Sequence, residues 1–232
     1  MISAEKLRKG IEKGWPICLG YIPIGLSFGV LAQKGGLLPW QVAFMSIVVF
    51  AGGSQFIALQ MMASGSSIPA VTATAFMVNL RHLLMSSALS LHLKGASKNF
   101  LVFFSYGITD ESFAVNMGAL GRGEIDRESA LVLNQVANFT WVASTVAGVY
   151  IGEFIPSGAF GIDYALTGMF ICLLVFQLRG IIFVITAAIA AACSVAAYLL
   201  IPGNTYVILS AVTAATAGLM LKRRFGWNRE KR

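Results

Sequence analysis

The sequence predicts an all-α, polytopic membrane protein, and three observations support this class. The 232 residues are 57% hydrophobic and only 12% charged, whereas a soluble chain carries about 25% charged residues. Several apolar runs reach about 18 residues or more, the length that spans a bilayer. The excess of Lys and Arg lies mostly at the termini and in short loops, which is typical of cytoplasmic membrane edges rather than of nucleic-acid binding.

The chain is expected to begin with a cytoplasmic segment, residues 1–14, that contains an amphipathic stretch with Ser3 as a helix cap. The first span follows at about residues 15–33. A basic start before an apolar run resembles a signal peptide, but no small-residue cleavage site follows, so we interpret this run as a span.

The first span contains a proline and two glycines that bear on its structure. Pro23 removes a backbone donor, and we therefore expect a kink or an unwound turn there. Gly25 and Gly29 are four residues apart, a spacing that lets another helix backbone approach closely. Close packing is the simpler interpretation of these two glycines.

The second apolar run, residues 40–62, is interrupted at its centre by Gly52, Gly53, Ser54 and Gln55. Each glycine costs about 1 kcal/mol in a helix interior, and the two polar side chains lie at the same depth. We therefore expect a broken helix or a re-entrant hairpin, which is tolerated only where protein or water satisfies the backbone.

The third and fourth runs, residues 68–93 and 100–120, carry four ionisable side chains at membrane depth. Arg81 and His82 belong to the third run, and Asp110 and Glu111 follow the Gly107 interruption of the fourth. Because an Arg or Asp at the centre of a span costs about 2.5–3.5 kcal/mol, such residues usually face partners, water or a substrate path.

Two compatible interpretations of these charges stay open. Arg81 forms a structural ion pair with Asp110 or Glu111, or the group is a working site. Arg81 lies off the polar face that contains Asn79 and His82, so either the helix unwinds at Asn79 or Arg81 serves another neighbour. His82 is equally well explained as a satisfied interior histidine or as a proton carrier.

The remainder of the chain is expected to form four more spans. The fifth run, residues 130–152, has a polar stripe that lines a cavity or merely packs: Asn134, Asn138, Trp141, Thr145 and Gly148. The last three spans, about residues 164–178, 181–201 and 206–221, are nearly all apolar and predict scaffold. A basic tail, residues 222–232, ends in the cytoplasm.

The three cysteines, Cys18, Cys172 and Cys193, lie in apolar runs without paired spacing, so we expect buried thiols rather than disulfides or a metal site. No cofactor is expected. The whole chain is expected to form one transmembrane transport domain.

The positive charges favour one of two topologies. Eight simple crossings would leave Lys34, Lys94 and Lys98 outside, whereas six crossings with re-entrant runs 40–62 and 100–120 leave only Lys34 outside. Both schemes keep the two termini in the cytoplasm. A weak internal echo, with similar separations from Pro23 to Phe56 and from Asn79 to Phe113, suggests an inverted repeat or chance.

Four segments resemble the AzlC family of bacterial inner-membrane proteins: YIPIGLSFG (21–29), FAGGSQF (50–56), NLRHLLMS (79–86) and YGITDESFA (106–114). The resemblance covers most of the chain and is most specific between residues 21 and 114. It implies a permease that exports branched-chain amino acids and the leucine analogue azaleucine. It also implies a partner, the small membrane protein AzlD.

Such a substrate requires donors for a carboxylate and acceptors for an ammonium group, and broken helices expose N–H groups that bind carboxylates. We expect Arg81, His82, Asp110 and Glu111 to serve ion or proton coupling. The residues expected to bind substrate are polar groups and helix-breaking positions: Pro23, Gly25, Ser27, Gly52, Gly53, Ser54, Gln55, Asn79, Gly107 and Thr109.

No nucleotide-binding Gly-x-x-x-x-Gly-Lys-Ser/Thr loop is present, so an ion-gradient-driven carrier, and no enzyme, is expected. A channel explains the broken helices and buried charges equally well. A serine protease built on Ser54 and His82 is disfavoured because the usual glycine after the serine is missing. Expected partners are the bilayer, the AzlD-like subunit, the amino-acid substrate and a possible second copy, but no nucleic acid.

Overall fold

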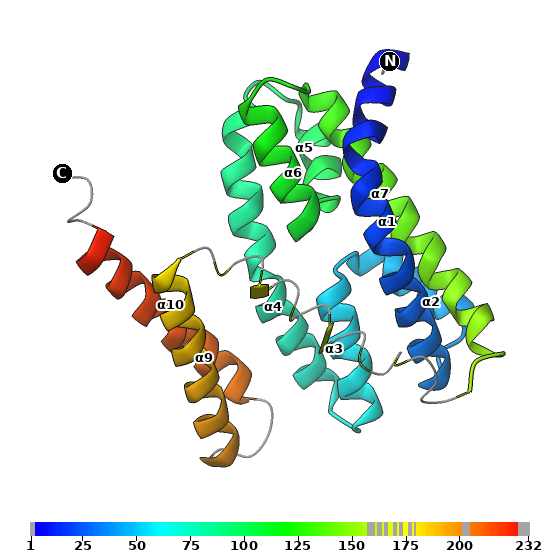
Figure 1. Ribbon diagram of the computed structural model, residues 1–232. Helices are drawn as coiled ribbons and strands as arrows, with labels where there is room; N and C mark the ends of the chain where they lie inside the picture. Colours follow the sequence, from blue (N-terminus) through cyan, green and yellow to red (C-terminus); the bar gives the residue numbers. More distant parts are fainter. Residues whose placement is uncertain are drawn as a thin grey trace. The chain divides into compact units, whose positions relative to one another are not determined.

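The structure is a computed structural model (Figure 1) that describes residues 3–156, 180–200 and 205–226, together with single positions between 161 and 178. All regular structure in these residues is helical. The chain divides into two compact units, Met1–Ser66 with Val78–Leu166, and Ser67–Met77 with Thr167–Arg232.

The helices up to residue 152 follow a pattern that occurs twice: one long helix and then two short helices. The first triplet comprises α1 (Ala4–Lys34), α2 (Pro39–Val49) and α3 (Gly52–Ala63). The second comprises α4 (Ile68–Leu89), which ends in the short 3₁₀ helix η1 (Ser90–His92), then α5 (Lys98–Tyr106) and α6 (Asp110–Gly121). The long helix α7 (Arg127–Gly152) follows both triplets.

The four short helices are too short to cross a bilayer singly. They contain 9 to 12 residues, which at about 1.5 Å per residue is half of the roughly 30 Å hydrocarbon core. Among the described residues, three helical stretches are long and apolar enough to cross: Ala4–Lys34, Ile68–His92 and Ile181–Leu200. The predicted interruption of both runs is confirmed.

The first interruption begins two residues before the glycines that predicted it. Phe50 ends α2 in the left-handed region, with φ of 38°, and Gly52 and Gly53 form the first turn of α3. Gly52 serves close packing, because a Cβ atom there would lie 2.9 Å from the ring of Trp141 on α7.

One of the two alternatives expected at Pro23 is wrong: the helix is not unwound there, because α1 runs unbroken from Ala4 to Lys34. The predicted N-terminal amphipathic stretch forms the first turns of this same helix. Gly14 lies against α7, where a Cβ atom would lie 3.4 Å from Leu133. The predicted cap is confirmed, since Ser3 accepts a hydrogen bond from the Lys6 amide at 3.4 Å.

Helices α1 and α7 pack together over most of their length in a parallel orientation. Lys6, near the start of α1, contacts Asp126 at the start of α7, and Gly152, at the end of α7, lies against Gln33. A Cβ atom on Gly29 would lie 2.1 Å from the Thr145 carbonyl oxygen. The close approach that the Gly25 and Gly29 spacing predicted is confirmed.

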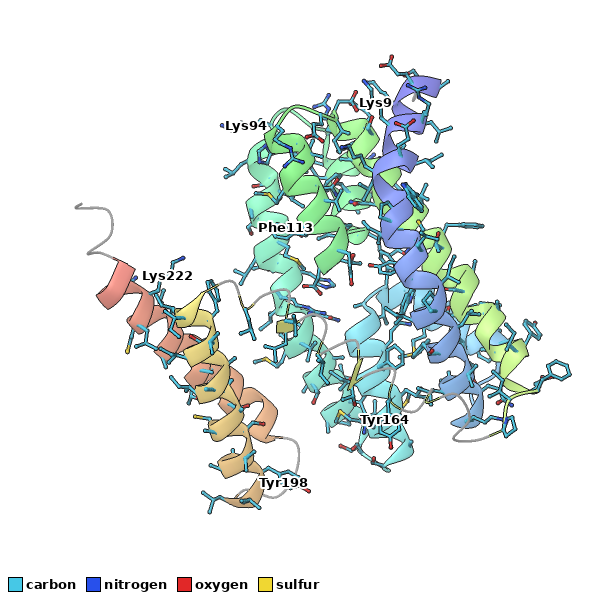
Figure 2. The ribbon with its side chains drawn as sticks, in the orientation of Figure 1. Lys9, Lys94, Phe113, Tyr164, Tyr198 and Lys222 are labelled. Atoms are coloured by element: carbon cyan, nitrogen blue, oxygen red, sulfur yellow. The ribbon has the colours of Figure 1, made fainter. Side chains whose placement is uncertain are left out.

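Each pair of short helices returns to the end of its triplet's long helix. Leu59 of α3 lies 3.1 Å from the position of a Cβ atom on Gly35, directly after α1. Ala119 of α6 belongs to the same buried cluster as Leu89 and Leu93, at the end of α4. Figure 2 shows Lys94 at the same end of the first unit as Lys9.

The second unit contains α9 (Ile181–Leu200) and α10 (Thr205–Gly226), which confirms helices in two of the last three predicted spans. They pack closely where Gly218 meets Thr186. The span predicted at residues 164–178 lies largely outside the described residues, as does Cys172. Cys18 and Cys193 are free thiols, but they are half-buried rather than buried because lateral helix faces stay uncovered.

Candidate functional site

The start of α3 is anchored by buried hydrogen bonds to α2 and α7. Gln55 is fully buried, accepts from Trp141 Nε1 at 2.9 Å and donates to the Ser46 hydroxyl at 3.1 Å. Ser46 in turn contacts the Thr145 hydroxyl at 2.9 Å. The polar stripe of α7 therefore packs against the interrupted run and satisfies its buried polar groups.

The break between α5 and α6 is held by the same face of α7. Asn134 donates to the Phe104 carbonyl at 3.2 Å and accepts from Asn116 at 2.8 Å. Gly107 is required there, since a Cβ atom would lie 2.7 Å from Asn134. Tyr106 accepts from Asn138 at 3.1 Å and donates to the Ile47 carbonyl at the end of α2, so the two breaks contact each other.

Helix α6 begins with a full set of caps. Thr109 is its N-cap and accepts from the Ser112 amide, while the Ser112 hydroxyl accepts from the Thr109 amide at 2.9 Å. This reciprocal cap fixes the backbone of the first turn, to which Asp110 and Glu111 belong.

Arg81 pairs with Asp110, one of the two acceptors that the sequence left open. The Arg81 guanidinium lies 2.9 Å from Asp110 Oδ2, and the two side chains are 30% and 24% exposed. Helix α4 is continuous through Asn79. The alternative in which Arg81 serves a neighbour outside its own polar face is therefore confirmed, and unwinding at Asn79 is wrong.

Glu111 has no cation as its partner in the described residues and is bound by a tyrosine instead. The Tyr21 hydroxyl of α1 donates to Glu111 Oε2 at 2.8 Å and lies 2.6 Å from the Thr109 hydroxyl. A single guanidinium thus compensates only one of the two adjacent carboxylates.

Asn79 connects the second triplet to the first. Its amide donates to the Ser54 hydroxyl at 3.1 Å, and that hydroxyl donates to the Ala51 carbonyl at 3.0 Å. Ser54 therefore lacks a hydrogen bond to His82 in the part of the chain that the structure describes. His82 itself is half-buried and lies within electrostatic range of Arg81 and Glu111.

Two polar atoms of α4 are buried without a hydrogen-bond partner among the described residues. They are Asn79 Oδ1, an acceptor, and Arg81 Nε, a donor. An unpaired buried polar atom costs about 1–3 kcal/mol. The two atoms leave one acceptor and one donor of α4 unsatisfied within the described residues.

The structure brings most, but not all, of the predicted site residues together. The starts of α3 and α6, Asn79 and the charged group lie around the two breaks. Pro23, Gly25 and Ser27 do not contact this group: Ser27 donates to the Pro23 carbonyl at 2.9 Å, and Gly25 lies against Ser144 of α7. These three residues stay apart from the group because α1 is continuous and does not unwind at Pro23.

Sequence reasoning missed two residues that connect the site. Tyr21 belongs to the first quoted segment but was not selected, and Trp141 was assigned only to a stripe. Both are buried, and their rings meet edge to face with centroids 5.4 Å apart. A signal existed, since a Tyr or Trp within an apolar run usually requires a partner for its polar atom.

The fold and the site together define a helical membrane protein with two interrupted helices around a half-buried charged group. The sequence comparisons agree with this class. The model of the AzlC protein family matches residues 16–155, which includes the site. The chain belongs to the AzlC family.

Three relatives show how far the similarity extends. An uncharacterized membrane protein of Archaeoglobus fulgidus is 31% identical over 98% of both chains. The inner membrane protein YgaZ of Escherichia coli is 33% identical over 65% of this chain and 61% of its own length. The branched-chain amino acid transport protein AzlC of Bacillus subtilis is 26% identical over 83% of this chain and 76% of its own. No solved structure matches the chain.

Proposed function

We propose that this chain is the large subunit of a secondary transporter that exports branched-chain amino acids, namely valine, leucine, isoleucine and their analogues. The proposed driving force is the proton gradient. The observation that carries the proposal is the half-buried group of Arg81, Asp110 and Glu111, in which one carboxylate has no paired cation among the described residues. The Bacillus subtilis relative named for branched-chain amino acid transport supports the substrate class.

The proposed substrate site lies between α4 and the first turn of α3. The carboxylate of the amino acid would accept from Arg81 Nε and from the amides of Gly52 and Gly53 at the helix start. The ammonium group would donate to Asn79 Oδ1. Glu111, rather than Asp110, would carry the coupling proton, because Asp110 is held by Arg81.

The proposal includes an inverted repeat of the two triplets. Two hydrogen bonds support it, because each joins a short helix of one triplet to the long helix of the other. Ser54 of α3 bonds Asn79 of α4, and Glu111 of α6 bonds Tyr21 of α1. Transporters commonly build a midplane site from such repeats with broken helices.

We further propose six crossings, with both termini in the cytoplasm and the two pairs of short helices re-entrant. The position of Lys94 beside the end of the unit that contains Lys9 supports this scheme (Figure 2). Both units would act as one transport domain in the inner membrane. An AzlD-like subunit is proposed to cover apolar faces such as that of α9, whose side chains are largely exposed.

Transport by reconstituted protein tests the proposal. Proteoliposomes that contain the chain with an AzlD-like subunit should exchange labelled leucine, saturate with leucine concentration and accumulate leucine when a proton gradient is imposed. The chain alone should be much slower. Flux that neither saturates nor counter-exchanges would identify a channel, and equal rates with and without the small subunit would contradict the proposed partnership.

A further inference from the structure

Tyr21 is the only described link between α1 and the carboxylate of Glu111. Its ring is 5% exposed, and its hydroxyl lies 2.8 Å from Glu111 Oε2 and 2.6 Å from the Thr109 hydroxyl. A phenol has one proton to donate. When the Tyr21 hydroxyl donates to the carboxylate, its oxygen is free to accept from the Thr109 hydroxyl. Both hydroxyl protons then have an acceptor.

The bond from the Tyr21 hydroxyl is strongest when Glu111 is ionised. If Glu111 takes up a proton, the charged acceptor is lost, and hydrogen bonds to charged acceptors are roughly twice as strong as those between neutral groups. The contact between α1 and α6 therefore weakens when Glu111 is protonated. The corresponding bond of the other pair, Asn79 with Ser54, joins two neutral groups and does not respond to pH.

The groups around Glu111 identify Tyr21 as its direct partner. Tyr21 acts from α1, His82 from α4 and Asp110 from the same turn of α6, and Asp110 is itself paired with Arg81. Of these groups, Tyr21 alone forms a hydrogen bond with Glu111 in the described residues.

The Tyr21 ring also connects, through Trp141, to the break between α2 and α3. Its ring meets Trp141 edge to face, and Trp141 donates to Gln55 and lies against Gly52 at the start of α3. A displacement of Tyr21 would therefore reach the helix end at which the substrate carboxylate is proposed to bind.

We propose that Tyr21 is a positioning residue that holds Glu111 to α1 while the carboxyl is ionised and releases it when a proton binds. The inference rests on the proposed function for the role of Glu111 as proton carrier. It adds the residue that converts the arrival of a proton into a change of contact between the two triplets.

Infrared titration of the purified chain in lipid nanodiscs tests this role without any transported solute. The band of the protonated Glu111 carboxyl is assigned by its loss in Glu111→Gln. Tyr21→Phe keeps the ring on Trp141 but removes the donor, so the titration midpoint of this band should move up by about one pH unit. Tyr106→Phe removes a hydroxyl that contacts no carboxylate among the described residues and should leave the midpoint in place.

An unchanged midpoint in Tyr21→Phe would overturn the proposal. If that variant does not fold, the unmodified chain provides a second measurement, because a tyrosine C–O band should change with the midpoint of Glu111 and stay constant in Glu111→Gln. A tyrosine C–O band that stays constant while Glu111 titrates would also overturn the proposal. Failure of the leucine exchange assay, with both bands behaving as expected, would instead contradict the proposed function alone.

Discussion

At the scale of single residues, the charged group was predictable, but its pairing was not. Arg81, Asp110 and Glu111 stand out in the sequence because charge is costly at membrane depth. In the first turn of α6, Asp110 bonds Arg81 of α4 and Glu111 bonds Tyr21 of α1. The cap of this turn is visible in sequence, but the direction of its neighbours is set by packing.

The two carboxylates should respond differently to neutral substitution. Glu111→Gln should abolish proton-coupled export while leucine still exchanges between the two sides, because the amide accepts from Tyr21 but cannot titrate. Asp110→Asn should only weaken export, since the amide still accepts from Arg81. Export and exchange in proteoliposomes distinguish these outcomes. Normal pH dependence in both variants, and its loss in His82→Gln, would identify His82 as the proton carrier.

Loss of the Arg81 ion pair should lower stability to a moderate extent. Removal of one partner of a fully buried pair costs about 3–5 kcal/mol, but Arg81 and Asp110 are 30% and 24% exposed. We therefore expect a cost of about 1–2 kcal/mol for Arg81→Ala, measured as a lower thermal midpoint in detergent. The thermal midpoint of Arg81→Lys should fall between those of Arg81→Ala and the unmodified chain, because lysine keeps the charge but loses the planar fork of the guanidinium. A thermal midpoint in Arg81→Ala equal to that of the unmodified chain would show that the pair carries no stability.

At the scale of helices, the interruptions at glycine and polar residues were predicted correctly, whereas the unwound turn that was one expectation for Pro23 does not form. Gly52 and Gly107 mark the two breaks because both lie against side chains of α7 that leave no room for a Cβ atom. Pro23 removes a single hydrogen bond from a helix of 31 residues. The continuous contact between α1 and α7 is sufficient to keep that helix intact, and such a contact cannot be read from one sequence.

The contact between α1 and α7 should depend on its glycines. Gly29→Leu should lower the thermal midpoint, because a Cβ atom would lie 2.1 Å from the Thr145 carbonyl, and overpacking costs about 1–3 kcal/mol. Gly20→Ala is the matched control, since no atom lies within 4 Å of its Cβ position. The alanine should be neutral or stabilising by up to about 1 kcal/mol. Equal thermal midpoints for both variants would contradict the packing described.

The loop before α7 should contribute a pH-dependent part of stability. Hydrogen bonds from Arg122 and Lys13 lower the pKa of Glu124 from 4.5 to about 2. The stabilisation is therefore present above pH 4.5 and is lost as the pH falls toward 2. Glu124→Gln should lower the thermal midpoint at neutral pH. The difference in midpoint between this variant and the unmodified chain should shrink as the pH falls from 4.5 toward 2, and it should also shrink in high salt. A difference that stays constant with pH would indicate that Glu124 acts only through packing.

At the scale of the whole molecule, the repetition of the triplets is the feature that the sequence only suggested. The separations from Pro23 to Phe56 and from Asn79 to Phe113 echoed each other weakly, since the two triplets share little beyond the positions of their breaks. The structure gives both triplets the same order of one long and two short helices. What the sequence could not supply is the set of bonds between them, because these join residues far apart along the chain.

The central claim is that each pair of short helices enters and leaves the membrane on the same side. Cysteine labelling tests this claim most directly. Single cysteines at Ser66, Ser97 and Gly123 would be placed in a chain without its three native cysteines. In intact cells, an impermeant thiol reagent should label Ser66→Cys and spare both Ser97→Cys and the cytoplasmic control Gly123→Cys. Labelling of Ser97→Cys with protection of Ser66→Cys is the result that eight crossings require, and it would contradict the account.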